Sequence, residues 1–423
     1  MTTAAARPWF SAFGVELEYM IVDAQTLAVR AIADELLRDV AGSYTGEVER
    51  GEISWSNELA LHVVELKTTE PAADLAPLPQ RFLAEIHEIN RLLAVRGARL
   101  MPSAMHPWMD PHRQMRLWPH EYSPVYEAYN RIFDCRGHGW ANLQSAHLNL
   151  PFAGEEQFVR LHAAIRLLLP ILPALAASSP LADGRLTGLA DTRLEVYRDN
   201  ARRIAAITAL VVPESVRSID EYHRTILQPM YAQIAPLDPE GILQHEWLNS
   251  RGAIARFDRS AIEIRVLDVQ ECPAADVAIA AVAAAVLRDA AQERFAVLER
   301  QLAVSTEQLA AILLAVTREG ENAAIDDETY LAVWGFRGKR ATAAELWRHL
   351  IDGQLTPGAE RPWWLGPIER IQAQGTLARR IVRALGTEAS SAEAGAAAPE
   401  RMADVYRQLC DCLSEGTMFV PTA

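Results

Sequence analysis

The sequence predicts an α+β protein built around an antiparallel sheet. Short segments alternate apolar and polar residues with the period of two that is typical of strands, and longer segments repeat apolar residues at helical spacing. The two kinds of segment do not alternate regularly along the chain, which favours an antiparallel sheet over repeated βαβ units. The chain has 423 residues and is 50% hydrophobic, so it is long enough to bury a large core.

The expected strands and helices follow one another in an irregular order. Strands are expected where the alternation is clear, namely over 14–23, 59–68, 98–108 (running into a loop), 141–152 and 261–268. Helices are expected over 78–97, 155–177, 192–210 and 274–294, and over most of the last third of the chain. The segment 109–142 is rich in aromatic residues, His and Pro and fits neither pattern, so we expect a long loop that lines a site.

The composition restricts the classes of partner. A formal net charge of −14 argues against non-specific binding to nucleic acid and against a general attraction to membranes. No stretch reaches the roughly 18 apolar residues of a membrane span, and the N-terminus lacks the apolar core of a secretory signal. Four cysteines are too few for a disulfide scaffold at this length, which favours a cytoplasmic location. The sequence leaves open whether the chain forms a homo-oligomer.

The first predicted strand, GVELEYMIVD, carries two acids in its middle, Glu16 and Glu18. Because side chains alternate along a strand, both acids lie on one face, while Val15 and Leu17 lie on the other. Two adjacent carboxylates repel each other and are costly to remove from water. Such a pair is expected either in open solvent or around a cation.

Other predicted strands repeat this arrangement. Glu263 shares a face with Arg265, His147 shares one with neighbouring polar residues, and Glu65 lies among apolar residues. Glu58 precedes Glu65 by seven positions, so an uninterrupted strand would send it to the opposite face unless a turn or bulge intervenes. Taken together, these strands predict a sheet with one hydrophilic, cation-binding face. Hard carboxylate oxygens suit Mg²⁺ or Mn²⁺, and the histidine admits some preference for Mn²⁺.

Several common catalytic motifs do not occur in this sequence. It contains no G-x-x-x-x-G-K-[ST] loop, no Rossmann G-x-G-x-x-G, no H-E-x-x-H and no G-x-S-x-G. If the chain handles a nucleotide, it therefore does so through metal ions and arginines.

Five short motifs in consistent order resemble the glutamate–cysteine ligase family 2, which comprises bacterial carboxylate–amine ligases related to glutamine synthetase. They are GVELE (14–18), VELKT (64–68), QSAHLNL (144–150), ASSP followed by TGLADTR (177–193), and IEIRVLD (262–268). The resemblance implies a curved antiparallel sheet that forms a funnel-shaped site, with helices packed outside. The low-complexity composition of 386–400 separately predicts a linker, which would divide the chain into a catalytic domain over 1–385 and a C-terminal helix over 401–423.

The resemblance also implies roles for individual residues. The ligands of Mg²⁺ or Mn²⁺ would be Glu16, Glu18, Glu58, Glu65, His147 and Glu263. Arg265 and Arg193 would be catalytic, with Arg265 and Arg198 contacting the phosphates of ATP. Arg193 and Arg251 would bind a substrate carboxylate.

The implied activity is ATP-dependent formation of an amide from small-molecule substrates. The γ-carboxylate of glutamate would be activated as an acyl phosphate and joined to cysteine or another amine, while Trp118, Tyr122, Tyr126 and Trp140 cover the site. The chain departs from the family at HLNLP, where many members have H-V-H-V-G, and at Arg251-Gly252, where they have Arg-Pro. The acceptor therefore need not be cysteine. Two other classes stay open, a metal-dependent hydrolase of an amide or phosphate ester and a catalytically silent binding protein.

Overall fold

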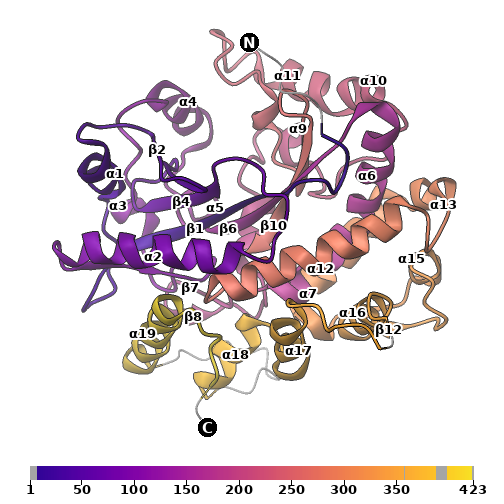
Figure 1. Ribbon diagram of the computed structural model, residues 1–423. Coiled ribbons are helices and arrows are strands. Elements are labelled where there is room, and N and C mark those ends of the chain that lie inside the picture. The colour runs from indigo at the N-terminus through magenta and orange to yellow at the C-terminus, as the bar shows by residue number, and fades with distance from the viewer. Residues whose placement is uncertain (1–6, 357, 387–397, 422–423) are drawn as a thin grey trace.

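The computed structural model describes residues 7–356, 358–386 and 398–421, which form one eight-stranded sheet with helices around it (Figure 1). The strand order is β2-β3-β4-β1-β6-β10-β9, with β5 also paired to β1, and the pairing is antiparallel throughout. The strands are β1 (Gly14–Asp23), β2 (Glu47–Glu49), β3 (Ile53–Asn57), β4 (Val63–Thr68), β5 (Ala98–Met101), β6 (Ser145–Pro151), β9 (Ala253–Arg256) and β10 (Ala261–Asp268). The predicted fold class is confirmed.

Helices, short hairpins and loops make up the rest of the described chain. The longer helices are α1 (Ala33–Ala41), α2 (Leu78–Ala94), α4 (Ser123–Phe133), α6 (Gly154–Leu168), α12 (Pro273–Ala291), α14 (Thr306–Glu319), α16 (Ala343–Asp352), α17 (Leu365–Gln374), α18 (Leu377–Ala384) and α19 (Pro399–Glu415). The shorter ones are α3 (Pro111–Gln114), α5 (His138–Ala141), α7 (Pro173–Ala176), α8 (Thr192–Arg198), α9 (Ala205–Thr208), α10 (Ile219–Tyr222), α11 (Gln228–Ile234), α13 (Leu298–Ala303) and α15 (Glu328–Val333). Two small hairpins pair β7 (Leu181–Ala182) with β8 (Arg185–Leu186), and β11 (Ala324–Ile325) with β12 (Ala341–Thr342).

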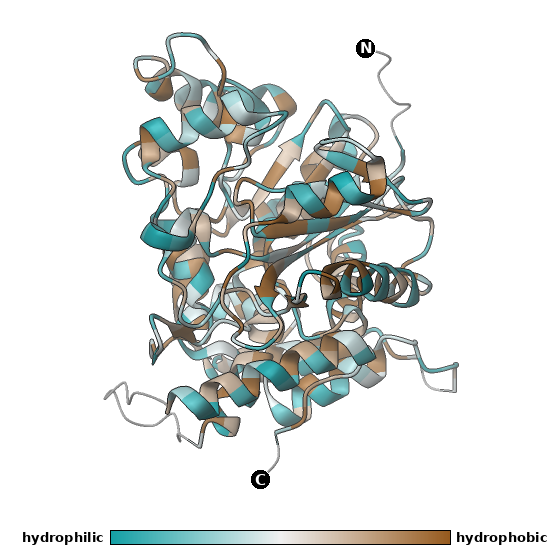
Figure 2. Cartoon of the chain, turned by 90° about the vertical axis from the view of Figure 1, so that its left-hand side faces the viewer, coloured by the Kyte–Doolittle hydropathy of each residue, from teal (hydrophilic) through white to brown (hydrophobic). Residues whose placement is uncertain are grey.

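One face of the sheet is apolar and packs on helices. Val15, Leu17 and Tyr19 of β1 lie in the main core together with residues of α2 and α12. Helix α12 is buried on almost all sides, because its many alanines let neighbouring helices approach closely. Figure 2 shows hydrophobic residues concentrated in the strands, whereas the peripheral helices mix hydrophobic and hydrophilic residues. This apolar packing leaves the opposite face of β1 for its acids.

The C-terminal helices form a second, smaller core. Met20 on β1 and Met101 on β5 pack with apolar residues of α18 and α19. The guanidinium of Arg380 in α18 is fully buried and pairs with Glu271, and it donates a hydrogen bond to the carbonyl of Phe419 at 2.7 Å. A buried charge is stable only when it is paired in this way. The end of the described chain is thereby fastened beside the sheet, next to the part of β1 that follows its acids.

Several expected elements differ from the structure. The strand expected over 59–68 begins only at Val63, because a turn separates β3 from β4. The helix expected over 192–210 is broken into α8 and α9. The expected loop 109–142 contains α3, α4 and α5, and α4 buries Ala128, Tyr129 and Ile132 at helical spacing. Helix α19 begins at Pro399, inside the expected linker, of which residues 387–397 lie outside the described residues.

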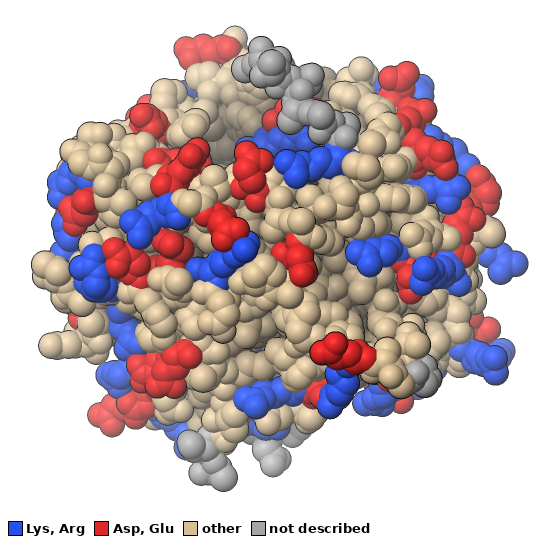
Figure 3. Space-filling model, in the orientation of Figure 1, with Lys and Arg blue, Asp and Glu red and all other residues tan. Residues whose placement is uncertain are grey.

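The surface shown in Figure 3 mixes charges of both signs. Acidic and basic side chains are interspersed over this face rather than gathered into one region. Among the described residues, no helix combines the length and the apolar character that crossing a bilayer would require.

The backbone at Gly252 does not accommodate the proline of the Arg-Pro pair. A Cβ atom at this position would lie 2.4 Å from Cγ1 of Val266 and 3.0 Å from Cδ1 of Leu169. The Gly252 amide also donates to the carbonyl of Val211 at 2.7 Å, a bond that proline cannot make. In turn, the carbonyl of Gly252 accepts from the amide of Arg265 at 2.8 Å. The close packing at Gly252 therefore helps to position the backbone of Arg265, a predicted site residue.

We predict that Gly252→Ala destabilises the protein, because the new methyl group overlaps Val266. Overpacking of this kind costs about 1–3 kcal/mol, and urea denaturation would measure it. The matched control is Gly137→Ala before α5, where φ is −98° and an added Cβ meets no atom within 4 Å apart from its chain neighbours. That control should be neutral or stabilising by up to about 1 kcal/mol. Equal urea midpoints for the two variants would contradict the packing argument.

Candidate active site

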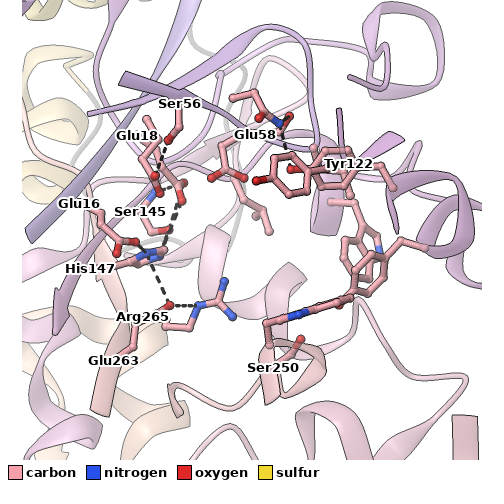
Figure 4. Close-up of a pocket in the computed structure, with 18 of the residues that line it drawn as sticks. Glu16, Glu18, Ser56, Glu58, Tyr122, Ser145, His147, Ser250, Glu263 and Arg265 are labelled. Carbon is pink, nitrogen blue, oxygen red and sulfur yellow. Dashed lines mark hydrogen bonds and ion pairs between the residues drawn. The ribbon is translucent and has the colours of Figure 1, made fainter. Parts of the chain in front are cut away.

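The hydrophilic face of the sheet forms one wall of a cavity of about 660 Å³. The lining comes from β1, β3, β4, β6 and β10 on one side and from α4, α5 and α8 on the other. All the predicted metal ligands line it, namely Glu16, Glu18, Glu58, Glu65, His147 and Glu263. Figure 4 shows Glu16, His147 and Glu263 grouped at one side, Tyr122 at the other, and Glu58 between them.

Strand register explains why residues so distant in sequence meet here. In the antiparallel pairs, Glu18 lies opposite Glu65, Glu16 lies opposite His147, and Glu263 lies opposite Asn149. Side chains of directly opposed residues point to the same face of a sheet and lie close enough to interact. The period of two along each strand therefore gathers these side chains on one surface.

His147 is the centre of the first group of acids. Its Nδ1 lies 2.7 Å from Oε2 of Glu16 and 3.8 Å from Oε1 of Glu263. Burial opposes charge on both Glu16 and His147, but the hydrogen bond and the electrostatic attraction between them outweigh this effect. They lower the pKa of Glu16 to about 2 and raise the pKa of His147 to about 9. Asn149 also donates to Glu16 at 3.0 Å, so this carboxylate is held in one orientation.

A second group of acids shares the same histidine. Glu18 accepts hydrogen bonds from the amide and hydroxyl of Ser145 at 2.7 and 3.1 Å, and this hydroxyl lies 2.9 Å from Nε2 of His147. Glu65 accepts from the hydroxyl of Ser56 at 2.7 Å. Burial, followed by the negative charge of Glu16, raises the pKa of Glu65 to about 7. The carboxylates are thus close enough for their repulsion to affect ionisation.

Glu58 completes the acidic lining from the turn between β3 and β4. The sequence left open whether a turn or bulge intervenes between Glu58 and Glu65 or whether only one of them faces the site. The structure has a turn there, and both side chains line the cavity. Burial, followed by the charges of Glu18 and Glu65, raises the pKa of Glu58 well above its usual range.

The donor set fits a hard divalent cation. Two groups each offer three ligand atoms within 4.8 Å of one another, Glu16 with His147 and Glu263, and Glu18 with Glu65 and His147. Carboxylate oxygens with one imidazole are suitable ligands for Mg²⁺ or Mn²⁺. A cation would also relieve the repulsion that raises the pKa of Glu65 and Glu58.

Two of the predicted arginines reach this cavity. Arg265 lines it, with Nε 3.0 Å from Oε1 of Glu263. Arg193 also lines it and is held from behind by Asp268, a fully buried ion pair. Asp268 in turn accepts hydrogen bonds from the amide of Ser178 and the hydroxyl of Ser179, both at 2.8 Å. This network fixes the orientation of Arg193.

The other two predicted arginines lie elsewhere. Arg198 follows Arg193 by more than one helical turn on α8 and lies outside the cavity lining. It forms an ion pair with Glu195 there. Arg251 is buried outside the cavity lining in a bidentate pair with Glu214, at 2.6 and 2.7 Å. Neither side chain lines the cavity, so the phosphate contact expected of Arg198 and the substrate contact expected of Arg251 stay predictions without support from this geometry.

Aromatic side chains form the opposite wall of the cavity. We define the aromatic wall as Tyr122, Tyr126, Tyr129, Trp140 and Trp247, all of which line the cavity. Trp118, expected among them, is instead buried in the main core. Tyr129 and Trp247 were not predicted. The helical spacing of α4 could have indicated Tyr129, but Trp247 is brought in from a distant segment by the tertiary fold alone.

Basic side chains missing from the prediction also line the cavity. Lys67, which the register places opposite Glu16, forms ion pairs with Glu65 at 3.3 Å and with Glu47 at 3.1 Å. Arg256 on β9 and Arg259 in the turn after it contribute further positive charge. The alternation of β4 already placed Lys67 on the face of Glu65, whereas no motif marks the two arginines. The cavity therefore combines an acidic centre with a basic margin.

The family model described as glutamate–cysteine ligase family 2 matches residues 12–407, and the chain belongs to this family. An uncharacterized protein of Archaeoglobus fulgidus is 37% identical over 280 residues, which cover 66% of this chain and 75% of the relative.

Solved structures share the fold. A bifunctional glutathione synthetase from Pasteurella multocida has a TM-score of 0.60 and 16% identity, with 95% of this chain matched to 53% of that longer chain. A glutamate–cysteine ligase from Francisella tularensis has a TM-score of 0.55 and 12% identity. The match covers 95% of this chain and 88% of that chain. The family and the fold together support a carboxylate–amine ligase.

We predict that Mg²⁺ or Mn²⁺ raises the melting temperature of the protein, because binding to the native acidic centre stabilises the folded state. At about 100 times its Kd, the ion adds about 2.7 kcal/mol to the free energy of unfolding. Glu16→Gln should greatly reduce the shift, whereas Glu49→Gln, an exposed acid on β2, should preserve it. A shift of equal size in Glu16→Gln, or none in the unmodified protein, would contradict the assignment.

Proposed function

We propose that the protein is an ATP-dependent ligase that joins the γ-carboxylate of glutamate to an amine by way of an acyl phosphate. The observation that carries this proposal is the pair of acidic groups sharing His147, with Arg265 ion-paired to Glu263 beside them. These parts match the needs of phosphoryl transfer, which requires positive charge and positioning rather than a covalent protein nucleophile. Membership of a ligase family supports the same chemistry.

The reaction is proposed to proceed in two steps. A carboxylate oxygen of glutamate attacks the terminal phosphorus of ATP, the bond to the bridging oxygen breaks, and ADP leaves. The amine nitrogen then attacks the acyl carbon, the bond to the phosphate oxygen breaks, inorganic phosphate leaves, and the nitrogen loses its proton to solvent. Activation is necessary because a free carboxylate is a poor electrophile and an oxide is a poor leaving group.

Each part of the site has a role in this scheme. A bound Mg²⁺ or Mn²⁺ ion would supply positive charge next to the phosphate oxygens. The guanidinium of Arg265 neutralises charge that develops on the transferred group, and Arg193 adds a fixed positive charge beside it. Arg256, Arg259 and Lys67 are available to the anionic ends of the substrates. The Francisella tularensis ligase was solved in complex with AMP, which supports a nucleotide site in this fold.

The acyl phosphate must be protected from water, and the aromatic wall is suited to this task. Its apolar surface lies across the cavity from the acidic centre and limits the access of solvent to the intermediate.

The test is release of ADP in the presence of Mg²⁺, ATP, glutamate and a panel of amines. The proposal predicts that ADP forms only when glutamate is present and that an amine accelerates it. Release of product from a phosphate ester or amide without ATP would instead identify a hydrolase. No turnover of either kind by folded, metal-loaded protein would overturn the ligase proposal.

We predict that Arg265→Met lowers kcat by roughly 100- to 1,000-fold, the usual effect of removing one group that stabilises charge in the transition state. Melting temperature and the metal-induced shift would show that the variant is folded and binds the ion. Arg202→Met serves as a matched control, because Arg202 is exposed and pairs with Asp199 outside the cavity lining. An Arg265→Met variant with unchanged kcat would exclude the role given to this residue.

A further inference from the structure

The aromatic wall brings five aromatic rings to the cavity, and the polar atoms of two of them are hydrogen-bonded within the protein. The hydroxyl of Tyr126 accepts a hydrogen bond from Asn57 at 3.0 Å, and the indole nitrogen of Trp140 donates to the carbonyl of Asn200 at 3.0 Å. Trp140 and Trp247 stay partly exposed although neighbouring apolar residues are buried. Since the Tyr126 hydroxyl oxygen and the Trp140 indole nitrogen already have protein partners, what these two residues offer a ligand is largely apolar ring surface.

The rings also support one another as a continuous surface. The ring centroid of Tyr129 lies 5.1 Å from that of Trp140 and 6.0 Å from that of Trp247. Trp140 is further stacked on Phe133 at 5.5 Å, which fixes its orientation from behind. Rings held in this way form a rigid platform. The protein therefore loses little additional conformational entropy when a ligand packs on them.

The wall lies directly beside the reacting centre. The amide of Asn57 donates both to Tyr126 and to the carbonyl of Glu58, at 3.0 and 3.3 Å. Tyr129 lines the same cavity as Arg265 and Glu58. Figure 4 places Glu58 between the acidic centre and Tyr122.

The position of the aromatic wall beside the acidic centre distinguishes between two groups that could pack on it, the base of ATP and the acceptor amine. The base of ATP is separated from its terminal phosphorus by a ribose and two further phosphates, so it cannot pack next to the group that is transferred. The amine that attacks the acyl phosphate must, by contrast, reach the acyl carbon, and its side chain then extends onto the surface next to that carbon. The wall is therefore positioned for the acceptor rather than for the base.

We infer that the acceptor of this ligase is a primary amine carrying an apolar, ring-sized group, with its nitrogen near Glu58 and its ring packed on Tyr129, Trp140 and Trp247. The inference rests on the proposed function and deepens it by naming the class of the second substrate. A cavity of about 660 Å³ has room for such an amine beside glutamate and the terminal phosphates. A small acceptor would leave much of the apolar wall in contact with water.

The experiment compares 2-phenylethylamine with ethylamine in two assays. In the first, with Mg²⁺, ATP and glutamate, kcat/KM should be roughly 10- to 100-fold higher for 2-phenylethylamine, the usual discrimination for a buried ring. In the second, isothermal titration calorimetry with Mg²⁺, glutamate and a non-hydrolysable ATP analogue should show tighter binding of 2-phenylethylamine. Trp140→Leu and Trp247→Leu should each reduce both preferences and leave KM for glutamate nearly unchanged.

Trp363→Leu is the matched control, because Trp363 is 40% exposed and does not line the cavity, so both preferences should persist. Equal kcat/KM and equal affinity for the two amines would overturn the inference while the ligase proposal stands. Displacement of 2-phenylethylamine by adenosine would assign the wall to the base and overturn it as well. Selective binding of 2-phenylethylamine without ADP formation under any condition would support the apolar subsite and overturn the ligase.

Discussion

The mutual repulsion of carboxylates on one face of a sheet is the constraint on which the rest of this structure depends. Glu16, Glu18, Glu65 and Glu263 are largely withdrawn from water around a single histidine. Without a compensating cation, such a group disfavours folding. Part of the compensation comes from the protein, since His147 is charged when it pairs with Glu16 and Lys67 pairs with Glu65. The apolar packing of the opposite face on α2 and α12 stabilises the sheet on which the acids are mounted.

Local alternation was enough to predict the centre of the site. In β1 and β10 the acids alternate with buried apolar residues, so their common face could be inferred from the sequence, and the register confirms that the strands are neighbours through β6. The position of Glu58 was ambiguous because periodicity does not reveal where a turn begins. The pairing of β3 with β4 resolves it.

Contacts between distant segments were not predictable in the same way. Arg198 lies close in sequence to Arg193, but the direction of α8 turns it away from the cavity. Arg251 lies close in sequence to β9, but its ion pair with the partly exposed Glu214 holds it outside the cavity lining. Trp247 reaches the aromatic wall only through the fold of the segment before β9. The acidic face of the cavity could be predicted from strand periodicity, whereas the aromatic wall depends on loops and short helices.

The shared face of the sheet is proposed to hold divalent cations between its carboxylates. The most direct measurement is anomalous X-ray diffraction from crystals soaked with Mn²⁺. We expect anomalous peaks within about 2.0–2.4 Å of carboxylate oxygens of Glu16, Glu18, Glu65 or Glu263. Crystals that show no peak there, with the acids still paired to His147, Lys67 and Arg265, would contradict this assignment.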